Sequence, residues 1–396
     1  MLGYIRDILI AFFLGASIFA DAFFVAFRLP NTFRRLFAEG TFNAAFIPSY
    51  TAAKIEGKKK GKIFADNILR LILIILVFIV TIAEIFTPYL VYLIAPGFIV
   101  DEIKFNLAVE FTRITFPFLL FVTLSSFFSG ILNSYNKFAA AAAAPIILNV
   151  VLIVSIIISY FNDFNVAKQL SIGVTIAGIL QLIFLIYFTN KFYKPSLKFN
   201  FIISKQVKFF FKKLVPSIFS SGVTQINILV GTIIASFQAN AVSYLYYADR
   251  IYQINLAIAG IAIGTVLLPS LSKYINSKNI TKIEFIQNKS LELSLFLSLP
   301  AAAALLIASE EITSALFGYG SFDINSVINS AQALFYFALG LPAFALIKVF
   351  SSFLFARHNT KTPFHFSILS VFLNVFISIY FFNKIGFIII PIATTI

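Results

Sequence analysis

Ionisable side chains interrupt two long apolar stretches, one near the start and one near the middle of this sequence. They are Arg6, Asp7, Asp21, Arg28, Arg34, Arg35 and Glu39 in the first stretch, and Asp249 and Arg250 in the second. A charge at the centre of a bilayer costs about 2.5–3.5 kcal/mol on insertion scales, so each one requires a partner or a water-filled cavity. These residues are therefore the first candidates for a functional site.

The arginines outnumber the carboxylates in these stretches. A guanidinium group never deprotonates in a protein, and its parallel N–H donors match the oxygens of a phosphate. Proton pumps rely instead on titratable carboxylates or histidines, which do not dominate here. We therefore interpret the pattern as a cationic cavity for an anionic substrate, and a pyrophosphate fits it well.

Several of these charges also have a simpler structural explanation. Arg35 and Glu39 are four residues apart and can pair within one helix. The long apolar stem of the Arg28 side chain can let its guanidinium group reach the membrane interface. Asp249 and Arg250 can form a local structural pair. Both explanations stay open for each of these residues.

Other kinds of chemistry have little support in the sequence. It contains no cysteine and two histidines, which excludes a disulfide framework, thiolate metal sites and a histidine-based metal cluster. Neither a phosphate-binding GxxxxGK[ST] motif nor a Gly-x-Ser-x-Gly motif is present. We expect no enzyme activity, no bound metal and no organic cofactor.

The elements that hold these charges are predicted to be membrane-spanning helices. The 396 residues are 60% hydrophobic and 12% charged, whereas a soluble domain has roughly 45–50% apolar and about 25% charged residues. Runs long enough to span a bilayer fall near 4–16, 19–53, 64–93, 104–132, 139–160, 166–189, 214–236, 240–271, 284–308, 326–356, 362–382 and 385–396. The second and eighth runs are long and charged, so we expect bent or broken helices there.

The net charge of +14 is explained by the connections between these runs. Lysines and arginines gather in every second connection, whereas the alternate connections hold acidic residues. The positive-inside rule places the basic connections in the cytoplasm. The charge therefore reflects membrane topology, and we expect no nucleic-acid partner. Residues 202–213 mix lysines with phenylalanines, which predicts an amphipathic helix on the cytoplasmic surface.

An internal repeat divides the chain into two halves. Leu148-Asn149-Val150 recurs as Leu373-Asn374-Val375, and Pro117 recurs as Pro342. The repeat predicts two parallel bundles of six spans, a plan that transporters use to place a substrate site between halves. We expect an N-terminal lobe over 1–190, a basic cytoplasmic linker with its amphipathic helix over 191–213, and a C-terminal lobe over 214–396.

Several motifs make the sequence similar to a known family. They are "GASIFADAFFVAFRLPNTFRRLFAEGTFNAAFIPSY" at 15–50, "APGF" at 95–98, "FPFLLFVTLSSFFSGILNSYNKF" at 116–138, "YYADRI" at 246–251 and "GTVLLPSLSK" at 264–273. In this order and over the whole chain, they resemble the MurJ (MviN) family of lipid II flippases. That family lies in a superfamily that also contains multidrug and oligosaccharide exporters.

The resemblance implies an all-α integral membrane protein of the bacterial inner membrane, with two pseudo-symmetric six-helix bundles around a central cationic cavity. Family members move lipid II, an undecaprenyl-pyrophosphate-linked peptidoglycan precursor, from the cytoplasmic to the periplasmic leaflet. The expected partners are lipid II and membrane lipids, and the oligomeric state is left open. Members have fourteen helices, and we expect helices thirteen and fourteen to be absent from this chain.

The resemblance also implies roles for individual residues. The family's essential arginines correspond to Arg6, Arg34 and Arg250, and its first-lobe acidic positions to Asp7, Asp21 and Glu39. We expect Asp7, Asp21 and Asp249 to orient the arginines, Ser243 to bind substrate, and Glu39 with Lys348 to form a gate. The tyrosines at 246 and 247 either pack or offer hydroxyls to a sugar. Gly231 stands where members often have an acidic or amide side chain, which argues against cation coupling, although Asn374 is present.

Three alternatives compete with this interpretation. A related exporter could carry another lipid-linked oligosaccharide or an amphipathic drug, although a drug exporter should have fewer cavity arginines and more carboxylates. A membrane enzyme acting on polyprenyl phosphates would require clustered acidic residues or histidines, usually with Mg²⁺. A structural membrane protein would have no need of the repeat or of the buried charges.

Overall fold

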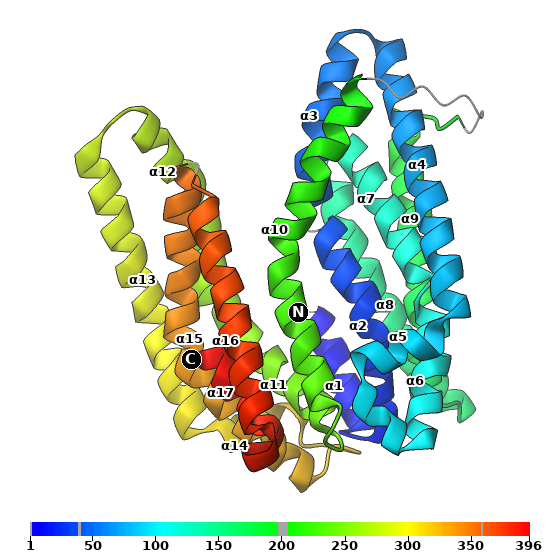
Figure 1. Ribbon diagram of the computed structural model, residues 1–396, viewed down its shortest axis with the longest axis vertical. Coiled ribbons are helices and arrows are strands. Elements are labelled where there is room, and N and C mark those ends of the chain that lie inside the picture. Colours follow the sequence, from blue (N-terminus) through cyan, green and yellow to red (C-terminus); the bar gives the residue numbers. More distant parts are fainter. Residues whose placement is uncertain (1, 39–40, 197–204, 358) are drawn as a thin grey trace. The chain divides into compact units, whose positions relative to one another are not determined.

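The computed structural model describes residues 2–38, 41–196, 205–357 and 359–396. Within these residues the chain is helical throughout and contains no strand (Figure 1). Two compact units are distinguished. The first comprises Met1–Leu9 and Ile18–Gln225, and the second comprises Ile10–Ser17 and Ile226–Ile396. Helix α1 (Leu2–Leu14) and helix α10 (Lys205–Ala235) therefore each contribute to both units.

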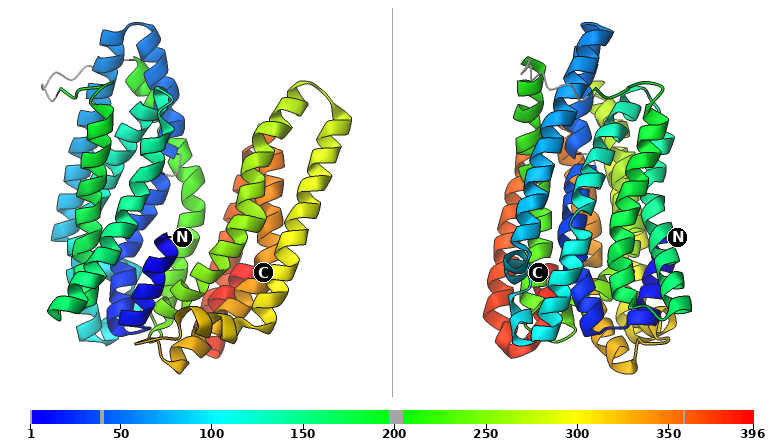
Figure 2. Two further views of the ribbon diagram at one scale, coloured as in Figure 1. Left: turned by 180° about the vertical axis from the view of Figure 1, so that it is seen from behind. Right: turned by 90° about the vertical axis from the view of Figure 1, so that its right-hand side faces the viewer.

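The first unit holds the helices that carry most of the predicted site residues. They are α2 (Ile18–Ala38), α3 (Thr41–Ile55), α4 (Lys58–Ile85), α5 (Thr87–Ile94), η1 (Pro96–Val100), α6 (Glu102–Thr115), α7 (Phe118–Ser134), α8 (Phe138–Asn162) and α9 (Val166–Thr189). Helices α8 and α9 lie side by side, as both Figure 1 and the reverse view in Figure 2 show.

Aromatic rings in edge-to-face and tilted contacts form the core of the first unit. The ring of Phe46 in α3 lies 5.2 Å from Phe127 of α7, 6.0 Å from Phe64 of α4 and 6.3 Å from Phe210 of α10. Because lipid tails are as apolar as these side chains, close packing rather than exclusion from water holds membrane helices together. Each aromatic pair adds about 0.5–1.5 kcal/mol beyond its buried area.

Hydroxyl groups satisfy backbone carbonyls near two of the prolines in this unit. Pro30 has no N–H for the carbonyl of Ala26, and the hydroxyl of Thr115 donates to that oxygen at 3.1 Å. Pro117 separates α6 from α7, and the hydroxyl of Thr175 donates to the carbonyl of Ile114 beside that break. An unsatisfied backbone group costs several kcal/mol in lipid, so these hydroxyls make the breaks tolerable.

The second unit contains the remaining helices. They are α11 (Ala241–Leu256), η2 (Ala257–Ala262), α12 (Ile263–Asn276), α13 (Ile280–Ile307), α14 (Ser309–Phe317), α15 (Ile324–Ala356), α16 (Lys361–Ile385), η3 (Gly386–Ile388) and α17 (Ile389–Thr395). Segment η2 is a π-helix, and the buried hydroxyl of Ser294 donates to the carbonyl of Ala259 within it at 2.8 Å. A β-carbon on Gly260 would lie 3.0 Å from the α-carbon of Ala345, so this segment packs tightly against α15.

Among the described residues, eight helical stretches are long and apolar enough to cross a membrane. They are Lys58–Ile85, Glu102–Ser134, Phe138–Asn162, Val166–Thr189, Ala241–Asn276, Ile280–Ile307, Ile324–Ala356 and Lys361–Thr395. The break expected in the eighth run is confirmed, because the π-helix η2 separates α11 from α12. The second run comprises α2 and α3, and residues 39–40 between them lie outside the described residues.

The basic segment before residue 214 differs from the separate surface helix that we expected. From Lys205 onward it forms the first turns of α10, and residues 197–204 lie outside the described part of the chain. Val207 and Phe210 are buried in the aromatic core of the first unit. The apolar face of this segment therefore packs against protein. The lobe boundaries expected at 190 and 214 stay a prediction.

Candidate functional site

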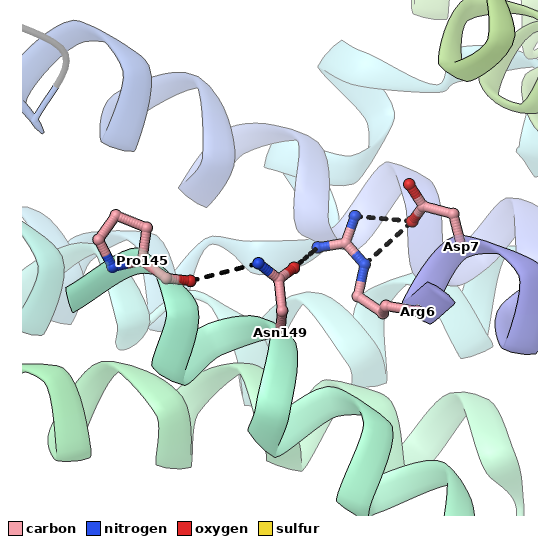
Figure 3. Close-up of polar contacts among 4 residues, drawn as sticks. All are labelled: Arg6, Asp7, Pro145 and Asn149. Carbon is pink, nitrogen blue, oxygen red and sulfur yellow. Dashed lines mark hydrogen bonds and ion pairs between the residues drawn. The ribbon is translucent and has the colours of Figure 1, made fainter. Parts of the chain in front are cut away.

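Arg6 in α1 is held by two partners within the first unit. Its Nε and Nη2 atoms donate to one carboxylate oxygen of Asp7 at 2.9 and 2.6 Å, and its Nη1 atom donates to the amide oxygen of Asn149 at 2.9 Å (Figure 3). The Arg6 side chain is 11% exposed and that of Asp7 is 4% exposed. The guanidinium group is thus fixed in orientation, and Asp7 offsets the cost of burying its charge.

Asn149 joins this cluster to helix α8. Its amide nitrogen is bonded to the carbonyl of Pro145 one turn earlier at 3.4 Å, which fixes the amide oxygen toward Arg6. A β-carbon on Gly3 would lie 3.4 Å from that oxygen, so α1 and α8 are in close contact here. The sequence marked Asn149 only through the Leu-Asn-Val repeat, and its role as a partner of Arg6 was missed.

Asp21 in α2 is paired with Lys104, which is not one of the predicted site residues. The ammonium group of Lys104 in α6 lies 2.5 Å from its carboxylate, and the two side chains are 0% and 6% exposed. The same ammonium group lies 4.2 Å from the centre of the Phe98 ring. Lys104 stands at the first position of a predicted span, where a lysine is usually taken as an interfacial anchor. The partner of Asp21 shown by this ion pair is therefore a lysine, Lys104, rather than one of the arginines.

Arg34 lies one turn after the proline break in α2. Its Nε atom donates to the amide oxygen of Asn31 at 2.9 Å, and its side chain is partly buried. Glu39 lies outside the described residues, so neither its pairing with Arg35 nor its gate contact with Lys348 is placed. Lys348 lies in α15 and forms no ion pair with any residue that the structure describes.

Arg250 in the second unit is positioned by an aromatic ring. Its guanidinium carbon lies 4.5 Å from the ring centre of Tyr246, one turn earlier in α11. A cation over an aromatic face gains about 0.5–1 kcal/mol when exposed and about 2 kcal/mol or more when desolvated. Asp249 accepts a hydrogen bond from the amide of Gln253 at 3.1 Å. These two adjacent residues therefore have different partners.

Two other residues of α11 are buried inside the second unit. Ser243 is fully buried, and so is Tyr247, whose hydroxyl donates to the carbonyl of Gly15 at 3.0 Å. The Tyr247 ring packs 4.9 Å from that of Phe322. Of the two alternatives for this tyrosine, the structure supports packing.

Of the two positions that bear on cation coupling, Gly231 has apolar surroundings and Asn374 is polar. A β-carbon on Gly231 would meet only the side chain of Ile390, at 3.5 Å. Asn374 is buried, and its amide nitrogen donates to the hydroxyl of Thr394 at 3.0 Å. In the described ranges of the chain, no group of three acidic residues or histidines could hold a metal ion.

Comparison with known proteins places these residues in a family. A family model described as "Lipid II flippase MurJ" matches residues 10–396. The "Probable lipid II flippase MurJ" of Rhizobium meliloti (strain 1021) is 42% identical over 398 residues, a match that covers 98% of this chain and 73% of the relative. The chain belongs to the lipid II flippase MurJ family. It is therefore a multi-pass protein of the bacterial inner membrane and a transporter rather than an enzyme.

Solved structures agree with this assignment. A MurJ structure described as "Lipid II flippase MurJ, inward closed conformation" matches with a TM-score of 0.88 and 28% identity, covering 100% of this chain and 82% of the other. An inward-facing MATE family multidrug resistance transporter of the MOP superfamily matches with a TM-score of 0.79 and 15% identity, covering 100% and 90%. The second likeness shows the fold alone. The predicted all-α membrane fold is confirmed.

Proposed function

We propose that this chain flips lipid II from the cytoplasmic to the periplasmic leaflet and so supplies precursor for cell-wall synthesis. The observation that carries the proposal is the Arg6 cluster, in which a partly buried guanidinium group is oriented by Asp7 and by Asn149. A partly buried cation of fixed orientation suits the pyrophosphate of a lipid-linked precursor. The family to which the chain belongs supports the same function.

Arg6 can accept a phosphate without losing its orientation. Its contact with Asn149 is a bond to a neutral acceptor, whereas a phosphate oxygen is charged. Charge-assisted hydrogen bonds are roughly twice as strong as neutral ones. A phosphate oxygen would therefore replace the amide oxygen on Nη1, while Asp7 continues to hold Nε and Nη2.

Arg34 and Arg250 are proposed to complete the recognition of the anion. The Asn31 amide accepts a hydrogen bond from Arg34, and the Tyr246 ring lies against the guanidinium group of Arg250. Ser243 is proposed as a polar contact for the substrate. Asp249 is proposed to orient Arg250, the next residue of α11. In this proposal Asp21 acts on the site through its pair with Lys104.

Transport requires the site to open to each side of the membrane in turn. We propose alternating access of the two lobes, with Glu39 and Lys348 as a gate contact that breaks and re-forms. The membrane potential is worth about 2.3 kcal/mol per charge per 100 mV and acts on an anionic substrate. The apolar surroundings of Gly231 favour such a drive over coupling to a cation at that position.

A genetic test addresses the activity and the arginine site together. The protein would be expressed in cells depleted of their own lipid II flippase, in parallel with Arg6→Ala, Arg34→Ala and Arg250→Ala variants. We expect growth with the unchanged protein and loss of growth with each variant at equal protein levels. Arg113→Ala is the matched control, because Arg113 is an exposed arginine of α6. Growth with all three site variants would contradict the arginine site.

The same test separates the alternatives. If the inserted protein fails to restore growth, an exporter of another lipid-linked oligosaccharide or of an amphipathic drug becomes the better account. A polyprenyl-phosphate enzyme would require clustered metal-binding carboxylates. No observation on the described residues favours that alternative.

A further inference from the structure

A small basic pocket lies at one end of the first unit. It has a volume of about 160 Å³ and is lined by Tyr50, Lys54, Lys58, Lys62, Tyr135, Phe192, Tyr193 and Lys194. These residues come from the end of α3, the start of α4, the connection after α7 and the connection after α9. Segments distant in sequence therefore bring four lysines to one place.

The lysines that line this pocket form no ion pair with an acidic residue in the described part of the chain. Lys58, Lys62 and Lys194 make no hydrogen bond or ion pair to a residue that the structure describes, and none of the lining residues is acidic. The nearby carboxylate of Glu56 is engaged with Lys60 at 3.2 Å and with Gln206 at 2.7 Å. The hydrogen bond from Lys60, and to a smaller extent that from Gln206, lowers the pKa of Glu56. The Glu56 carboxylate therefore stays ionised while it is bound to these two residues.

The walls of the pocket are held together by specific contacts. A β-carbon on Gly61 would lie 3.1 Å from the α-carbon of Lys54, so the absence of a side chain there lets α3 and α4 approach closely. The ammonium group of Lys54 lies 3.4 Å from the centre of the Tyr135 ring, which fixes it toward the connection after α7. These contacts keep lysines together that would otherwise repel one another.

The connection that carries Lys194 is fixed by a second set of contacts. The Tyr193 hydroxyl and the Ser196 N–H both donate to one carboxylate oxygen of Asp66, at 2.5 and 3.0 Å. Arg70 donates to the Ser196 carbonyl at 2.8 and 3.2 Å. Burial of the Tyr193 hydroxyl, together with its hydrogen bond to Asp66, raises the pKa of Tyr193. The hydroxyl therefore stays protonated and remains a hydrogen-bond donor. The pocket is thus built by buried polar contacts.

We propose that this pocket binds a phosphate group, supplied by the headgroup of an anionic membrane phospholipid. The pocket lies where spans end, with tyrosines beside lysines, as is typical of the interface between membrane and water. Basic pockets between helices on the cytoplasmic side suit anionic headgroups. A cavity of about 150 Å³ can hold benzene, and a phosphate group is no larger. This inference does not depend on the proposed transport of lipid II.

Native mass spectrometry of the detergent-purified protein tests the proposal. Phosphatidylglycerol would be titrated against the unchanged protein and against a Lys54→Gln/Lys58→Gln/Lys62→Gln variant, with phosphatidylcholine as the neutral-headgroup comparison. We expect the variant to bind phosphatidylglycerol roughly one-hundredfold more weakly, since each lysine near a membrane surface adds about a factor of five in affinity. Phosphatidylcholine binding should be unchanged.

The matched control is Lys59→Gln/Lys137→Gln/Lys191→Gln. These three lysines are exposed, lie near the same connections and do not line the pocket. The control removes the same charge, so equal weakening in both triple variants would overturn the proposal. A single Lys58→Glu variant, at an exposed position, provides a milder test should the triple variant be unstable.

Inorganic phosphate, titrated by calorimetry, distinguishes the source of the ligand. Lysine-dependent binding of phosphatidylglycerol supports a lipid headgroup. Lysine-dependent binding of inorganic phosphate without binding of the lipid supports the phosphate site and assigns it to a soluble ligand. If neither probe depends on the three lysines, the proposal is wrong.

Discussion

The buried ion pair between Asp21 and Lys104 should control the stability of the contact between α2 and α6. The two charged groups are 2.5 Å apart, and their side chains are 0% and 6% exposed. Removing one partner of a buried pair costs about 3–5 kcal/mol, because the other charge stays buried without compensation. Replacing both partners by apolar side chains is often neutral or stabilising. We therefore expect Asp21→Leu to destabilise the protein by about 3–5 kcal/mol, and Asp21→Leu/Lys104→Met to recover most of that loss.

The measurement is a double-mutant cycle on detergent-purified protein, made from the single Asp21→Leu and Lys104→Met variants and the double variant. Each variant would be heated, and the fraction that remains monodisperse would be followed with temperature. The exposed pair between Lys289 and Glu292 provides the control, since surface pairs contribute only about 0–1 kcal/mol. If the two single losses simply add in the double variant, the pair is not the source of stability. If the stable double variant fails to support growth in the genetic test, Asp21 has a direct role in substrate binding.

Three further perturbations have definite expected outcomes. Asn149→Asp replaces the neutral acceptor on Nη1 of Arg6 by a charged one. A phosphate oxygen would then have to displace a charge-assisted hydrogen bond of about 1.5–3 kcal/mol, which should reduce lipid II flipping by about tenfold or more. Asn162→Asp, at an exposed position of the same helix, should leave flipping unchanged, and equal effects would contradict the role of Asn149. Gly15→Ala should lower the melting temperature, because Gly15 has φ +58° and its β-carbon would lie 2.1 Å from a carbonyl oxygen; Gly222→Ala, with nothing within 4 Å, should not. Glu56 has a lowered pKa, so its contribution to stability is present above its ordinary pKa of about 4.3 and is lost as pH falls through its lower folded-state value. The Glu56→Gln variant should lack that part of the pH dependence of the melting temperature, and an unchanged profile would contradict it.

The sequence predicted the helical membrane fold because long apolar runs have few alternatives in a bilayer. It also predicted a break in the eighth run, since charge and length there exceed what one straight span requires. The form of the break was not predictable. The π-helix η2 depends on the Ser294 hydroxyl, which comes from another helix and reaches the carbonyl of Ala259. The two prolines of the repeat also differ in a way that the sequence does not show. Pro117 separates α6 from α7, whereas Pro342 lies within the continuous helix α15.

The charged residues themselves were visible in the sequence, but their partners were not. Arg6 and Asp7 are neighbours, so their pairing could be expected, whereas Asn149 and Lys104 meet their partners only through packing of distant helices. A lysine at the start of a span has the same sequence signature whether it reaches water or a buried carboxylate. The surface helix expected before residue 214 differs from the structure for a related reason. An amphipathic pattern shows that one face is apolar, but it does not show whether lipid or protein covers that face.

Direct observation of lipid II movement tests the central claim. Cells depleted of their own flippase would express this protein or its Arg250→Ala variant, and the fraction of lipid II accessible at the outer leaflet would be measured. We expect the unchanged protein to restore accessible lipid II and the variant, inserted at the same level, not to do so. Lipid II that stays inaccessible despite correctly inserted protein, or a variant as active as the unchanged protein, would contradict the proposed flipping.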